Sequence, residues 1–169
     1  DGYVSCQQTR VFAPTGFGMY VMAETLWNRS CTFEMLARKY FRMVYGDQAE
    51  AVLSYCKELS ALSYMEQPEN DDPGVCVEAV EKLKAAADLI RTYRPLFEKN
   101  LGDEKIQDRM AWKYLLYSGR AAEMYINMLK YRRLGAEDRV SEEYRKLKEY
   151  LCRTEEEWQE GFDVYWFVK

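Results

Sequence analysis

Apolar residues recur at helical spacing in the first half of the chain. From Phe33 they fall at the i, i+3, i+4, i+7 positions of an amphipathic helix, which Gly46 can end in the left-handed conformation. A second helix is predicted to follow, because Asp47 and Glu50 have the spacing of a capping box. This second helix should end before Pro68.

The second half of the chain predicts two long helices. Asp72 can cap a helix that has Pro73 as its first residue, and Pro95 should kink or end that helix. The longest periodic run lies between Asp103 and Gly135 and carries apolar side chains on two adjoining stripes. A helix so broadly apolar is expected to be central in the fold.

A further helix and an aromatic segment complete the pattern. The helix is indicated by a heptad-like seam consisting of Val140, Tyr144, Leu147, Leu151 and Trp158. Residues 161–167 are too aromatic to remain in water, so we expect them to dock on the helices.

The N-terminal residues depart from the helical pattern. Tyr3–Gln7 and Arg10–Phe12 contain β-branched and aromatic residues before Pro14, which predicts one short strand. A lone strand is not stable, and the chain lacks an initiating Met, so we expect a fragment whose strand belonged to a preceding sheet. The predicted fold is all-α: an up-down bundle of about five to six helices in residues 15–169, after an extended segment in residues 1–14.

Composition narrows the class of protein. The chain has 169 residues, 48% hydrophobic and 31% charged, which fits one folded domain and excludes intrinsic disorder. With 24 Lys+Arg against 28 Asp+Glu, the net charge of -4 is unsuited to a nucleic-acid partner. The sequence has no apolar run long enough to cross a bilayer. We therefore expect a soluble protein without nucleic-acid or membrane partners.

The residue inventory also limits the chemistry. The chain has no histidine, the commonest general base and metal ligand, and we expect neither a metal nor a cofactor. The five cysteines are widely spaced and form no C-x-x-C pair, which predicts buried free thiols. Unpaired thiols favour a cytoplasmic location.

Two acidic and two aromatic residues are candidates for a site. Glu24 lies in an apolar run where desolvation would raise its pKa. Asp163, in the aromatic segment near the C-terminus, is the only other acidic residue with similarly apolar neighbours in the sequence. Nothing in the sequence places the two together, so we assign no catalytic residue. Tyr20 and Trp27 lie seven residues apart on one helical face, which permits a sugar-stacking surface, although packing in the core is the ordinary role of such residues.

The first 65 residues carry a resemblance to a known group of proteins. The segments that carry it are Tyr20-Val21 with Leu26-Trp27-Asn28, Tyr40 to Ala49 around Tyr45-Gly46, and Tyr55-x-x-x-Leu59. This region resembles the helical part that follows the catalytic barrel in large bacterial glycoside-hydrolase-like proteins. These are the α-glucuronidase-like and hexosaminidase-like enzymes and a related family of unknown function.

The resemblance implies a function for the whole chain. Tyr3–Gln7 would be the last strand of a (β/α)8 barrel, and Gln7 and Arg10 would be the only residues near a substrate. The catalytic carboxylates of such proteins lie on earlier strands, so the chain alone should be inactive. It would be an accessory C-terminal helical domain that supports an upstream barrel and contributes a wall to a carbohydrate cleft. The alternative is an independent helical module for protein–protein interaction.

Overall fold

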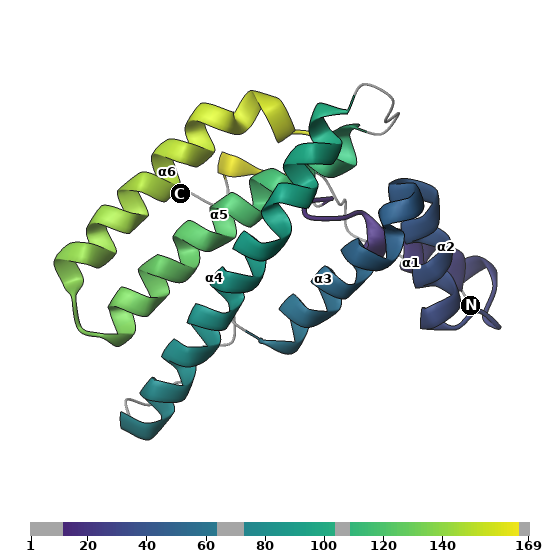
Figure 1. The fold of residues 1–169 in the computed structure, drawn as a ribbon. Helices are drawn as coiled ribbons and strands as arrows, with labels where there is room; N and C mark the ends of the chain where they lie inside the picture. The colour runs from purple at the N-terminus through teal and green to yellow at the C-terminus, as the bar shows by residue number, and fades with distance from the viewer. Residues whose placement is uncertain (1–11, 64–72, 104–108, 166–169) are drawn as a thin grey trace.

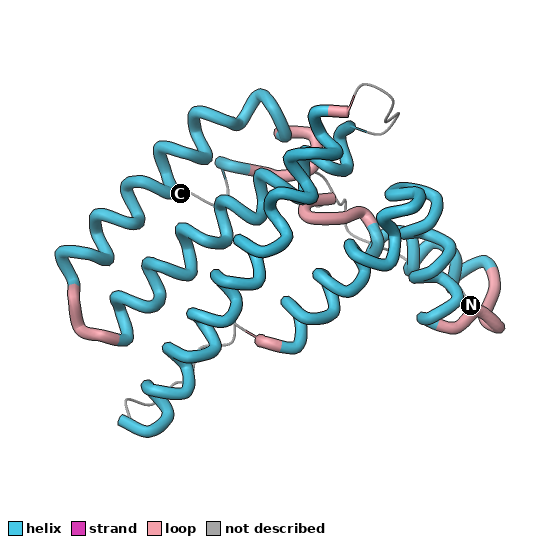
Figure 2. Tube along the Cα trace, viewed as in Figure 1, coloured by secondary structure: helices cyan, strands magenta, loops and turns pink. Residues whose placement is uncertain are grey.

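Helices account for most of residues 12–63, 73–103 and 109–165, which are the residues that the computed structural model describes (Figure 1). They are α1 (Phe17–Trp27), α2 (Phe33–Tyr45), α3 (Ala49–Ala61), α4 (Pro73–Gly102), α5 (Arg109–Arg133) and α6 (Glu137–Trp158), with a 3-10 turn at Gly46–Gln48. Figure 2 shows only helices and loops in these ranges. The prediction of an all-α helical bundle is confirmed.

Each helix packs mainly on its neighbours in the chain. The α5 helix lies between α4 and α6, α3 packs on α4, and α2 packs on α3 and α1 (Figure 1). The predicted central position of α5 is therefore confirmed. The longest helix, however, is α4 with 30 residues against 25 in α5.

Of the two outcomes predicted for Pro95, a kink or the end of the helix, the second is wrong, because α4 continues through this proline to Gly102. Beyond Pro95 the helix buries Phe97, whose ring centroid lies 5.1 Å from that of Tyr55 and 6.3 Å from that of Trp112. Proline inside a helix costs about 3 kcal/mol, a penalty that the burial of Phe97 helps to offset.

The α2 helix has the ends and the buried face that the sequence predicts. The hydroxyl of Thr32 accepts a hydrogen bond from the backbone N–H of Met35 at 3.3 Å, and Gly46 ends the helix with a φ of 56°. Leu36 and Phe41 are buried, but Phe33, which belongs to the predicted apolar stripe, is 53% exposed. The stripe therefore meets the core only from its second turn onward.

The predicted capping box at the start of α3 is not formed. Gly46–Gln48 forms a 3-10 turn, and the cap residue of α3, Gln48, makes no side-chain hydrogen bond to the helix. Asp47 instead pairs with Arg42, with Nη1 and Oδ1 3.1 Å apart. The next helix begins at Pro73 as expected, while Asp72 lies outside the described residues.

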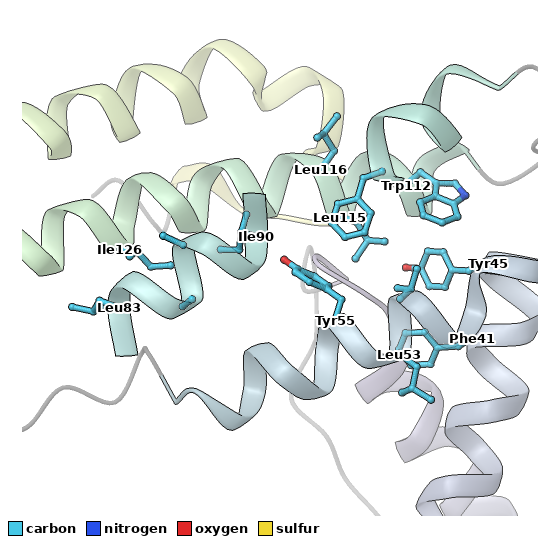
Figure 3. Packing of buried hydrophobic residues seen from close by; sticks show 14 of the residues in the cluster. Phe41, Tyr45, Leu53, Tyr55, Leu83, Ile90, Trp112, Leu115, Leu116 and Ile126 are labelled. Carbon is cyan, nitrogen blue, oxygen red and sulfur yellow. The ribbon is translucent and has the colours of Figure 1, made fainter. Parts of the chain in front are cut away.

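The buried side chains form two clusters. The larger one joins α2, α3, α4 and α5 with Val140 of α6, and Figure 3 shows residues of this cluster from α2, α3, α4 and α5. The smaller one consists of Leu147, Tyr150, Leu151, Trp158 and Val164. Four members of the predicted α6 seam are buried, but Tyr144 is 42% exposed and Tyr150 is buried in its place.

The segment after α6 docks on the bundle, as predicted, over the residues that the structure describes. Val164 is buried, and the Phe162 ring stacks on Trp158 with their centroids 4.6 Å apart. The carbonyl of Gly161 accepts hydrogen bonds from the backbone N–H groups of Phe12, at 2.9 Å, and Ala13, at 3.0 Å. Segments from opposite ends of the sequence therefore meet here.

The predicted N-terminal strand lies mostly outside the described residues, which begin at Phe12. Phe12 itself is not part of a strand. Across the described ranges, none of the helices combines the length and the apolar character that crossing a bilayer requires.

Candidate functional site

The α1 helix has an unusual surface. Its sequence, FGMYVMAETLW, is apolar on nearly every side and contains one charged residue, Glu24, yet none of its residues is buried. A helix that is apolar all round is ordinarily found inside a protein. In the described part of the chain, α1 packs mainly on one helix, α2.

Several exposed apolar residues flank the loop that joins α1 to α2. Four of them are Leu26, Trp27, Phe33 and Met35, and we call this group the hairpin tip. Trp27 is the most exposed of them, at 92%. Other large apolar residues with exposed side chains include Met43 on α2, Val77 on α4 and Leu134 after α5.

Aromatic packing holds the hairpin in a fixed geometry. The Phe17 ring lies 5.4 Å from the Phe33 ring and 5.3 Å from the Phe41 ring, between centroids. The backbone N–H of Ser30 donates to the Asn28 side chain at 3.0 Å in the connecting loop. The tip is therefore presented on an ordered support.

Glu24 is held by a cation. Its carboxylate lies 2.8 Å from Nζ of Lys39 on α2, and this hydrogen bond lowers the pKa of Glu24 below its ordinary value. The expectation that desolvation would raise this pKa is wrong, because Lys39 outweighs the effect of burial. The group that pairs with Glu24 is thus an ammonium rather than a second carboxylate, and Asp163 belongs to the segment after α6.

The two aromatic candidates have different surroundings. The half-buried Tyr20 ring packs against Tyr40, with centroids 5.3 Å apart, and Nζ of Lys39 lies 5.7 Å from the Tyr20 centroid. Trp27 instead projects into solvent. Sugar stacking at Tyr20 and Trp27 stays a prediction. Gln7 and Arg10, proposed to lie near a substrate, are outside the described residues, as are Cys6 and the side chain of Cys76.

The cysteines that the structure describes are free thiols. Cys56 is largely buried, and this burial raises its pKa to about 12. Cys31 is half-buried, whereas Cys152 is exposed, so the expectation of burial is wrong for Cys152. Within the described ranges, no group of three or more potential metal-binding side chains comes together.

Comparisons with protein-family models, curated proteins and solved structures found no match.

The hairpin tip is the feature that the sequence pattern did not reveal, because the pattern assigned Phe33 to a buried stripe. The signal that points to the tip is the polar segment from Asn28 to Thr32, which places apolar residues on both sides of an exposed loop.

Proposed function

We propose that this chain is a non-catalytic helical domain that packs through its hairpin tip on the catalytic barrel of a carbohydrate-active, glycoside-hydrolase-like protein. The observation that carries the docking role is the exposure of an apolar helix end, above all of Trp27. The resemblance of residues 20–59 to the helical region behind such barrels supplies the kind of partner.

The energetics favour a covered tip. A tryptophan buries on the order of 200 Å² in a contact, and burial of apolar area is worth about 25 cal/mol per Å², so covering Trp27 alone contributes about 5 kcal/mol. Tryptophan is also among the residues that dominate binding energy at protein interfaces. Leu26 and Phe33, on either side of the loop, are also more than half exposed, at 56% and 53%.

The other helices are suited to a supporting role. Arg91 and Arg94 of α4 both pair with Glu123 of α5, with Arg91 Nε 2.6 Å from the carboxylate. Lys113 of α5 pairs with Glu157 of α6 at 2.7 Å. These pairs, together with the apolar core, fix the three long helices against one another.

Acrylamide quenching of tryptophan fluorescence tests the proposal. Trp27 should be quenched readily in the 169-residue chain, and protected in the longer gene product that includes the region before Asp1. Subtracting the signal of a Trp27→Phe variant isolates Trp27 from the other three tryptophans, of which Trp112 and Trp158 are buried. The 169-residue chain should also hydrolyse no glycoside.

Two results would overturn the barrel partner. One is an initiator codon directly before Asp1, and the other is equal quenching of Trp27 in the long and short proteins. Hydrolysis of a glycoside by the 169-residue chain would overturn the non-catalytic role.

The same exposed tip also favours a second candidate, an independent module for protein–protein interaction. In that case Trp27 stays exposed in the complete gene product and becomes protected only when a separate protein is added. A mass increase in size-exclusion chromatography that Trp27→Ser abolishes would identify this second function.

A further inference from the structure

A cavity of about 220 Å³ lies at the start of α1, away from the hairpin tip. Its walls come from the loop before α1, from the second half of α2 and from the first turns of α5. The residues that line it include Phe12, Thr15, Tyr40, Tyr45, Ala111 and Tyr114. The cavity therefore lies between the α1–α2 hairpin and α5.

The lining specifies a neutral and largely apolar occupant. Among the described residues that line the cavity, none carries a charged side chain, so an ion buried there would find no counter-charge among them. Phe12, Tyr40, Tyr45 and Tyr114 instead offer aromatic rings, which favour a flat partner. The cavity is partly open to solvent, and its volume of about 220 Å³ has room for one ring with a small substituent, since an enclosed apolar cavity of about 150 Å³ holds benzene.

The walls are formed in advance by packing outside the cavity. Tyr45 is buried, and its ring centroid lies 5.0 Å from that of Trp112, an arrangement visible in Figure 3. Tyr40 is held by Phe17, with the two centroids 5.4 Å apart. A preformed site loses little conformational entropy when a ligand binds.

Polar groups limit the substituent. Hydroxyl groups of Thr15 and of the tyrosines belong to residues that line the cavity, while Val44, Met110 and Ala111 add only apolar surface. A sugar would present several hydroxyls to walls that are mostly apolar, which leaves polar groups unpaired. A single hydrogen-bonding substituent on an aromatic ring matches the lining better.

We propose that this cavity binds a neutral single-ring aromatic compound that carries one hydrogen-bonding group, with phenol as the simplest probe. The inference is independent of the proposed docking function, because the cavity and the hairpin tip share no residue.

NMR of the methionine methyl groups tests this site in the intact chain. Met110 lines the cavity, whereas Met128 is buried elsewhere on α5 and serves as the internal reference. Phenol should shift the Met110 signal in a saturable way with a millimolar Kd and leave Met128 unchanged. A Met110→Leu variant assigns the signal.

Two variants with matched controls sharpen the test. Ala111→Leu fills the cavity and should weaken phenol binding at least ten-fold, while Ala85→Leu on the exposed face of α4 should not. Thr15→Val should weaken phenol about five-fold, the effect of one hydrogen bond, and leave benzene binding unchanged. Thr92→Val is the control for that substitution.

The outcomes separate clearly. No saturable Met110 shift with phenol, or an equal shift at Met128, would overturn the proposal. Saturable binding of glucose in place of phenol would overturn the assignment of an aromatic ligand. Unchanged phenol affinity in a folded Ala111→Leu variant would place binding outside the cavity.

Discussion

Tyr150 is a buried phenol whose ionisation the fold opposes. Burial raises its pKa to about 12, against an ordinary value near 10, so the folded state holds the proton that the unfolded state releases. The resulting stability is complete below about pH 10 and is lost as the pH rises toward 12.

We therefore expect the melting temperature to fall between pH 10 and pH 12, and to fall less steeply in Tyr150→Phe than in the unchanged chain. Thermal melts by circular dichroism across this range measure the effect. Tyr144→Phe on the same helix is the control, because the Tyr144 ring is partly exposed. Equal slopes in both variants would contradict burial of the Tyr150 hydroxyl. Cys56, with its pKa also raised to about 12, adds to the loss in all of them.

Gly161 leaves no room for a side chain. A Cβ atom there would lie 2.6 Å from the Tyr114 ring, whereas a Cβ on Gly18 would meet nothing within 4 Å. We expect Gly161→Ala to lower the free energy of unfolding by about 1–3 kcal/mol. Gly18→Ala should raise it by up to about 1 kcal/mol, because alanine favours the helix. Urea unfolding measures both, and a neutral Gly161→Ala would show that Tyr114 moves aside without cost.

At the scale of the element, Leu115 tests the central position of α5. Its side chain is fully buried in the larger cluster, so Leu115→Asp places a carboxylate without a partner in the core. We expect a loss of several kcal/mol in the free energy of unfolding. Leu134→Asp is the control, since Leu134 is exposed. A near-native melting temperature for Leu115→Asp would contradict the helix packing described above.

The elements were predictable where local and tertiary preferences agree. The stripe from Leu36 to Phe41 and the glycine at position 46 lead to the same helix, and the structure has it. Local and tertiary preferences disagree at Pro95. Proline locally disfavours the interior of a helix, but the burial of Phe97 favours continuing it. Asp47 likewise forms an ion pair with Arg42 and does not cap the start of α3. This pairing depends on two side chains that meet across a turn.

At the scale of the whole molecule, the pattern gave the bundle but not the hairpin tip. Phe33 and Phe41 lie on the same stripe of α2, yet Phe41 is buried in the larger cluster whereas Phe33 stays 53% exposed with the Phe17 ring of α1 packed against it. The exposure of Trp27 depends on where α1 ends relative to every other helix. Such an outcome follows from three-dimensional arrangement, which residue spacing does not contain.

The meeting of Phe12 and Ala13 with the Gly161 carbonyl has a mechanical consequence. A force that pulls residues 12 and 161 apart acts directly on these two hydrogen bonds. It acts on them before it reaches the backbone hydrogen bonds within any helix. The two hydrogen bonds break one after the other, and only then does the force act on α1 and α6. The molecule should therefore lengthen in two stages, a short early step at low load and a longer one as the bundle comes apart.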